Sequence, residues 1–126
     1  MPIRGIRGAV NISADEPDEV FQATQELLTA ILDANPTLKP DDLASVLFTA
    51  TPDLHSAYPA QAARAMGWSH VPLLCFQEMS VVGSMPHVVR VLLHWNTDQP
   101  QDSMTHIYLR GTSNLRPDPT QDRNDK

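Results

Sequence analysis

Two apolar segments that each carry a single charge restrict the fold of this chain more than any other feature. Residues 73–79 read LLCFQEM, and residues 88–95 read VVRVLLHW. Such runs are typical of buried strands, yet Glu78 interrupts the first and Arg90 the second. Burying either charge is costly unless it has a partner. We therefore expect these two side chains to pair with each other or to face a ligand.

One long helix is predicted between the first two strands. Pro17 suits its first turn, Asp18 and Glu19 favour its positive start, and Asn35-Pro36 ends it. Its apolar stripe at helical spacing consists of Val20, Phe21, Thr24, Leu27, Leu28, Ile31 and Leu32. This stripe is expected to lie on the core.

The other segments predict mainly strands. These are expected at 3–10, 45–51, 71–78, 86–95 and 105–110, with a short helix between Pro59 and Gly67. The glycines of the first strand would let another group approach its backbone closely. Strands outnumber helices, so we predict an α+β fold, a β-sheet covered by one long helix. Residues 1–126 would form a single domain with a flexible C-terminal tail, 111–126.

The composition favours a cytoplasmic protein that binds neither nucleic acid nor a membrane. A net charge of −6 would repel phosphates, and no run of about 18 apolar residues could span a bilayer. The first ten residues lack the long apolar run of a secretory signal, so we expect none, and the single cysteine, Cys75, suits a reducing compartment. Seven of the nine basic residues are arginines, whose planar guanidinium binds carboxylates at two points. A small anionic ligand is one explanation for them.

We expect no metal, cofactor or covalent nucleophile. The five histidines include no pair three or four residues apart, and the glycines of RGIRGA lack dinucleotide-binding spacing. Cys75 lies in an apolar run, where an inert thiol is the simpler explanation. The remaining candidates are Arg7, Arg64, Glu78, Arg90, Tyr108 and Arg116. They indicate anion recognition, or catalysis by charge and shape alone, with a structural Arg90–Glu78 ion pair as the alternative.

Five segments, in order along nearly the whole chain, form a familiar set. They are IRGIRGA, ATPDLHSAYPAQAAR, GWSHVPLLCFQEM, VVRVLLHW and HIYLRGTSNLRPD. Together they resemble the monofunctional chorismate mutases of the Bacillus subtilis type. TPDLHSAYPA and VPLLCFQEM, at this spacing, are the most specific. The resemblance implies a mixed sheet in a pseudo-α/β-barrel homotrimer, with active sites between neighbours and no cofactor or metal. It implies the concerted rearrangement of chorismate to prephenate, in phenylalanine and tyrosine biosynthesis.

The resemblance also implies roles for individual residues. Arg90 would face the ether oxygen of the substrate, Arg7 would lie beside a carboxylate and the ether, and Glu78 would accept a hydrogen bond from the ring hydroxyl. The Cys75 backbone N–H would contact the same hydroxyl, and Tyr108 would hold the side-chain carboxylate. The further pocket residues that it implies are Tyr58, Ala60, Gln61, Arg64, Leu73, Leu74, Leu115 and Arg116, the last two in a tail that closes over the site.

Three of these positions depart from the family pattern. Gln61 stands where a lysine is common, Leu74 where a threonine is common, and Tyr58 where a phenylalanine is common. The loss of the lysine removes a positive charge near the mouth of the pocket, which would weaken capture of a dianion. Two other functions stay open: a non-catalytic or regulatory trimer that binds a small carboxylate, and an enzyme like the reactive-imine deaminases.

Overall fold

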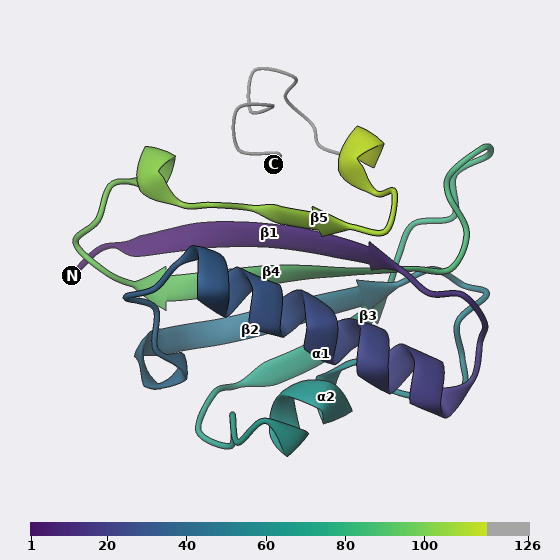
Figure 1. Ribbon diagram of the computed structural model, residues 1–126, viewed down its shortest axis with the longest axis horizontal. Helices are drawn as coiled ribbons and strands as arrows, with labels where there is room; N and C mark the ends of the chain where they lie inside the picture. Colours follow the sequence, from purple (N-terminus) through teal and green to yellow (C-terminus); the bar gives the residue numbers. More distant parts are fainter. Residues whose placement is uncertain (116–126) are drawn as a thin grey trace.

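The computed structural model of the protein describes residues 1–115, which form a five-stranded sheet and two helices (Figure 1). The elements are β1 (Ile3–Asn11), α1 (Pro17–Ala34), β2 (Leu43–Ala50), α2 (Ala60–Ala65), β3 (Leu73–Gln77), β4 (Val88–Asn96) and β5 (Ile107–Leu109). Single turns of 3-10 helix lie at Pro40–Asp42 (η1), Gln101–Ser103 (η2) and Ser113–Leu115 (η3). The α+β class predicted from the sequence is confirmed.

β4 is the central strand of a sheet whose order is β3-β2-β4-β1-β5. It runs antiparallel to β1 and β2, whereas the outer pairs, β2–β3 and β1–β5, are parallel. The sheet is therefore mixed. On one face of β4 the side chains of Val89, Val91, Leu93 and Trp95 are all buried, as the alternation of this segment predicted.

Both helices lie on the same face of the sheet (Figure 1). The crossovers β1–α1–β2 and β2–α2–β3 step across the sheet in the same direction. Right-handed crossovers that do so place their helices on one side. The prediction of cover by one long helix is corrected, because α1 packs on β1 and β5 while the short α2 packs on β3.

The long helix α1 begins and ends where the sequence predicted. Pro17 occupies its first turn, and Asn35 ends it, with the Asn35 side chain donating to the Ile31 carbonyl at 2.9 Å. Its buried residues are Val20, Ala23, Thr24, Leu27, Leu28 and Ile31. Gly8 of β1 lies beneath them, and a Cβ there would be only 3.0 Å from Leu27 Cδ1. Close approach to a glycine of this strand is therefore confirmed at Gly8.

The opposite face of the sheet is covered by neither α1 nor α2, and we call it the open face. Strand pairing places on it Arg7 and Ala9 of β1, Leu47 and Thr49 of β2, Leu74 and Phe76 of β3, Arg90 and Leu92 of β4, and Tyr108 of β5. Arg7 and Arg90, predicted as candidates from the sequence, thus project from the same surface.

β3 is an edge strand, although its apolar sequence suggested a buried one. Leu74 and Phe76 are 59% and 48% exposed, and Cys75 is half-buried. The physical reason is its position: β3 ends the strand order, and no helix covers its open-face side chains. The expectation of a buried strand is wrong for the single chain.

The first residues of the predicted flexible tail, 111–126, pack on the sheet. Thr112 is fully buried, and its Oγ1 lies 3.2 Å and 2.9 Å from the carbonyl oxygens of Ala9 and Leu109. Residues 116–126, including Arg116, lie outside the described part of the chain. Among residues 1–115, no helix has the length and apolarity needed to cross a membrane. The single domain and the cytoplasmic location stay predictions.

Candidate active site

A row of five side chains crosses the open face. Pairing between strands joins Phe76 to Thr49, Thr49 to Arg90, Arg90 to Ala9 and Ala9 to Tyr108. Neighbouring strands are about 4.8 Å apart, so the backbones of Arg90 and Tyr108 are separated by about 10 Å. Only the methyl group of Ala9 stands between them. Arg90 and Tyr108 therefore extend from the same face on either side of Ala9, which is itself fully buried.

Arg90 and Glu78 form an open ion pair at one end of this row. The Glu78 N–H donates to the Ala50 carbonyl at 2.8 Å, which extends the pairing of β3 with β2. Glu78 Oε1 accepts a hydrogen bond from Thr49 Oγ1 at 2.5 Å and lies 3.5 Å from Arg90 Nε. The two side chains are 40% (Arg90) and 25% (Glu78) exposed, so solvent or a ligand can reach both.

The Nε atom of Arg90 is buried but makes no hydrogen bond within the described residues. Its distance to Glu78 gives electrostatic attraction without the geometry of a hydrogen bond. A buried donor of this kind normally has an acceptor, because an unsatisfied polar group is costly. Because Nε itself is buried, a bound molecule can reach Arg90 only through the exposed part of its side chain.

Arg7 projects from the same face in the adjacent row. Its pairing partner on β4 is Leu92, which makes Arg7 a diagonal neighbour of Arg90, with backbones about 7–8 Å apart. The Arg7 N–H donates to His106 Nδ1 at 3.0 Å. Burial, together with the positive charge of Arg7, lowers the pKa of His106 to about 4. The imidazole is therefore neutral at pH 7, and Arg7 and Arg90 place two guanidinium groups on the same face of the sheet, which favours an anionic ligand.

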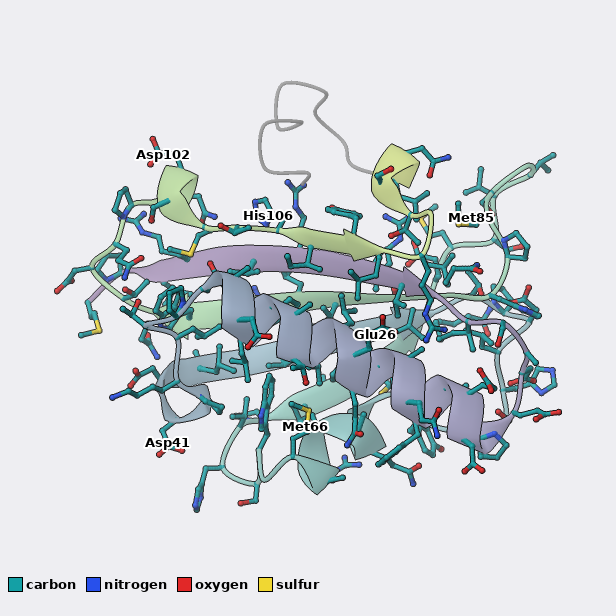
Figure 2. The ribbon with its side chains drawn as sticks, viewed as in Figure 1. Glu26, Asp41, Met66, Met85, Asp102 and His106 are labelled. Carbon is teal, nitrogen blue, oxygen red and sulfur yellow. The ribbon has the colours of Figure 1, made fainter. Side chains whose placement is uncertain are left out.

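A cavity of about 220 Å³ borders Arg90 and Glu78. Its other walls are Thr51, Met79, Val81, Ser84, Met85, Val88 and Leu115. Met85 belongs to the long connection between β3 and β4, on the right of the view in Figure 2. Leu115 comes from η3, so the structure brings this predicted pocket residue to Glu78 and Arg90.

Hydrogen bonds of Thr51 and Asp53 stabilise the end of the connection between β3 and β4 beside this cavity. Thr51 Oγ1 donates to Asp53 Oδ1 at 2.6 Å and accepts from the Val88 N–H at 3.0 Å. Asp53 Oδ1 also accepts from the His87 N–H at 3.1 Å. Burial alone would raise the pKa of Asp53, but these hydrogen bonds lower it below its ordinary value. The ionised carboxylate thus fixes the start of β4, two residues before Arg90.

A second set of predicted residues gathers around the start of α2. Tyr58, Gln61 and Cys75 line a second cavity of about 560 Å³, which shares the wall residue Thr51 with the first. Ala60 is buried in α2, and Arg64 is exposed on it. Burial raises the pKa of the Cys75 thiol, against the opposing effects of the Ala60 N–H and the charge of Arg64. The thiol is therefore protonated at neutral pH, which argues against a nucleophile.

Leu73 and Leu74 join neither set. Leu73 packs against the hydrophobic core on the helix side of β3, away from Arg90. Leu74 is on the open face, paired with Leu47, and its side chain projects from the opposite side of the strand to Cys75. Neither residue lines the two cavities described above.

The single chain thus divides the predicted residues into two groups. The sheet group consists of Arg7, Glu78, Arg90, Tyr108 and Leu115. The α2 group consists of Tyr58, Ala60, Gln61, Arg64 and Cys75. Sequence reasoning missed Thr49, which holds Glu78, and Ala9, which separates Arg90 from Tyr108. The only signal for them was the period of two within their strands, and that period does not reveal which strands are neighbours.

The chemistry of these groups is that of anion binding. Guanidinium groups, one carboxylate and a phenol can orient a dianion that also carries a hydroxyl group. Within residues 1–115, no group of three or more His, Cys, Asp or Glu side chains could hold a metal ion. Fold and site together define an α+β protein whose uncovered sheet face presents two arginines, a glutamate and a tyrosine.

Comparison with known proteins identifies the family. The family model "Chorismate mutase type I" matches residues 3–119. The chain is 53% identical to chorismate mutase AroH of Thermus thermophilus over 116 residues, which cover 92% of this chain and 95% of the relative. It is 46% identical to chorismate mutase AroH of Bacillus subtilis (strain 168) over 119 residues, 94% of this chain and 93% of the relative.

A solved structure gives the same result. A chorismate mutase from Clostridium thermocellum matches this fold with a TM-score of 0.85 and 42% sequence identity, covering 88% of this chain and 98% of that one. The chain therefore belongs to the chorismate mutase type I family. The resemblance drawn from the sequence is confirmed.

Proposed function

We propose that this chain catalyses the rearrangement of chorismate to prephenate. The observation that carries the proposal is the guanidinium of Arg90, whose Nε is buried, lies 3.5 Å from Glu78 and makes no hydrogen bond within the described residues. In a member of this family, the exposed part of this guanidinium can meet the ether oxygen of chorismate.

Arg90 lowers the barrier by electrostatic stabilisation. The reaction is intramolecular: the ether C–O bond breaks while a C–C bond forms, and no atom or proton is gained or lost. Negative charge grows on the ether oxygen as the C–O bond lengthens, so a fixed positive charge binds the transition state more tightly than the ground state. One preorganised donor of this type is typically worth about 3–4 kcal/mol.

The other residues of the sheet group hold the substrate in its reactive shape. Arg7 binds a carboxylate beside the ether, and Tyr108, across Ala9 from Arg90, binds the side-chain carboxylate. Glu78 Oε1 already accepts a hydrogen bond from Thr49 Oγ1, which leaves Oε2 to accept a hydrogen bond from the ring hydroxyl of the substrate. Holding these three points selects the compact conformer in which the reacting carbons are close, and so reduces the orientational part of the barrier.

The Cys75 backbone N–H is the second contact for the ring hydroxyl. The Glu78 N–H donates across to the Ala50 carbonyl of β2. Because successive N–H groups of a strand alternate in direction, the Cys75 N–H points to the outer edge of β3. That edge borders the cavity lined by Tyr58, Gln61 and Cys75. This position supports a contact between the Cys75 N–H of the α2 group and the ring hydroxyl.

We further propose a homotrimer with an active site between each pair of neighbouring copies. The open face presents Leu47, Leu74, Phe76 and Leu92, an apolar surface that a second copy would bury. Three members of the sheet group, Glu78, Arg90 and Leu115, line one cavity of the chain. Three members of the α2 group, Tyr58, Gln61 and Cys75, line a second cavity. A neighbour packed on the open face would bring its α2 group to the sheet group. Gln61, in place of a lysine, would then weaken capture of the dianion.

Purified protein and chorismate test the proposal. We expect loss of the ultraviolet absorbance of chorismate with prephenate as the product. Binding of chorismate without conversion would instead identify a non-catalytic or regulatory protein. Ammonia release from 2-aminoacrylate in a coupled assay, without any mutase activity, would identify an enzyme like the reactive-imine deaminases.

A further inference from the structure

The outer edge of β1 is paired in an unusual way on either side of Gly8. From Gly8 to Val10, β5 pairs with it as an ordinary parallel strand. Before Gly8, two side chains take the place of a neighbouring strand. The amide of Gln101 accepts from the Gly5 N–H at 2.8 Å and donates to the Gly5 carbonyl at 2.6 Å. His106 Nδ1 accepts from the Arg7 N–H at 3.0 Å.

The contact with His106 requires one particular state of the imidazole. Nδ1 can accept a hydrogen bond only while it carries no proton, so the single ring proton must be on Nε2. Burial and the positive charge of Arg7 both disfavour a second proton and lower the pKa of His106 to about 4. Figure 2 shows His106 at the start of the β5 arrow, alongside β1. The acceptor is therefore present throughout the neutral pH range.

We propose that His106 is a positioning residue for Arg7. Its Nδ1 fixes the backbone amide of Arg7 at the last position before β5 begins to pair, and so sets the direction in which the guanidinium leaves the strand. This inference rests on the proposed function, in which Arg7 binds a carboxylate beside the ether. A small displacement of a charged binding group changes the rate strongly, because the reaction depends on alignment.

The two edge contacts provide a matched pair of variants. His106→Ala removes the acceptor beside Arg7, whereas His106→Asn keeps an acceptor, since the Asn Oδ1 occupies about the place of Nδ1. Gln101→Ala removes a contact of the same kind at Gly5, which has no side chain, and serves as the control. His106→Gln, whose amide reaches the Nε2 position instead, replaces His106→Ala if that variant does not fold.

Two measurements test the inference: steady-state kinetics with chorismate as the substrate, and hydrogen exchange of the backbone amides followed by nuclear magnetic resonance. For His106→Ala we expect faster exchange of the Arg7 amide and a loss of about tenfold in kcat/KM, mostly through KM. His106→Asn should restore both, and Gln101→Ala should speed exchange at Gly5 while kcat/KM stays within about twofold.

Two results would overturn the inference. One is wild-type kcat/KM in His106→Ala although its Arg7 amide exchanges faster. The other is a ring nitrogen spectrum of the wild-type protein that places the proton on Nδ1. A wild-type protein that does not convert chorismate but keeps the Arg7 amide protected through Nδ1 would refute the proposed function, while the hydrogen bond itself would stand.

Discussion

At the scale of single residues, Arg90 is better explained by a ligand than by stability. Its ion pair with Glu78 is long, at 3.5 Å, and both side chains are partly exposed. Ion pairs of this kind contribute about 0–1 kcal/mol. A central strand whose other face is fully buried would be at least as stable with an apolar side chain at this position. The charge at position 90 therefore does not increase the stability of the fold, and a functional role explains its presence.

His106 makes the stability of the fold depend on pH in a defined window. In the unfolded chain its pKa is the ordinary 6.5, whereas in the folded protein burial and Arg7 lower it to about 4. Between these values the unfolded state binds the proton and the folded state does not, so stability falls as the pH decreases from 6.5 to about 4. Above 6.5 the contribution is complete.

Urea unfolding at several pH values measures this effect. We expect the free energy of unfolding of the wild-type protein to decrease across that window, and His106→Asn to remove that part of the decrease. Asp53 does not interfere, because its lowered pKa costs stability only as the pH falls below the ordinary value of 3.8. If the free energy of unfolding changed equally with pH in the wild-type protein and in His106→Asn, the assignment of this pH dependence to His106 would be wrong.

At the scale of elements, Gly8 lets α1 lie close to β1. A Cβ at Gly8 would be 3.0 Å from both Leu27 Cδ1 and the Ile107 carbonyl oxygen, and the backbone atom cannot move aside cheaply. We expect Gly8→Ala to destabilise the fold by about 1–3 kcal/mol in chemical denaturation. Gly5→Ala is the control, since its Cβ would make an ordinary contact of 3.6 Å with Leu92. Equal stability of the two variants would be inconsistent with this packing.

Elements with a strong period could be predicted from the sequence. The bounds of α1 follow from Pro17 and Asn35, and the alternation in β4 from Val89, Val91 and Leu93. The expectation that β3 is buried was wrong, because apolar side chains indicate burial but do not show which element covers them. Within residues 1–115 no helix covers Leu74 or Phe76.

The candidate site was predictable by residue type more than by position. The charges of Glu78 and Arg90 are conspicuous in apolar segments, and the resemblance to the family supplied their roles and that of Arg7. That Arg7 and Arg90 are diagonal neighbours depends on strand pairing across more than 80 positions of the sequence, which periodicity does not reveal. Thr49 was missed for the same reason, because its contact with Glu78 appears only when β2 and β3 are placed together.

At the scale of the whole molecule, the division of the site into two groups is the main structural argument for assembly. The sheet group lies on and beside the open face, whereas Tyr58, Gln61 and Cys75 of the α2 group line a second cavity of the same chain. An apolar surface on an edge strand also needs cover to avoid uncontrolled association. A closed trimer that buries the open face would satisfy both requirements.

Mixing inactive variants tests whether neighbouring copies share each site. Arg90→Ala disables the sheet group and Arg64→Ala the α2 group, so each protein alone should be nearly inactive. After joint refolding in equal amounts, random assortment should leave roughly a quarter of the sites with both groups intact and restore a similar share of activity.

The control mixes Arg90→Ala with Glu78→Ala, which lie in the same group and should regain nothing. Mass measurements must show that mixed assemblies form. Mixed trimers of the first pair without recovered activity would mean that one chain provides a whole site.

The central claim is that the charge of Arg90, rather than its shape, accelerates the reaction. Replacement of Arg90 by citrulline keeps the size, the planar end group and the Nε–H donor of the side chain. It replaces one NH2 group with a carbonyl oxygen and so removes the charge. The same replacement at Arg110, which pairs with Glu26 at 2.8 Å, is the control. We predict that the change at Arg90 lowers kcat by at least about a thousandfold in a protein that still folds and assembles, while Arg110 tolerates it. Nearly wild-type kcat in the Arg90→citrulline enzyme would contradict the account.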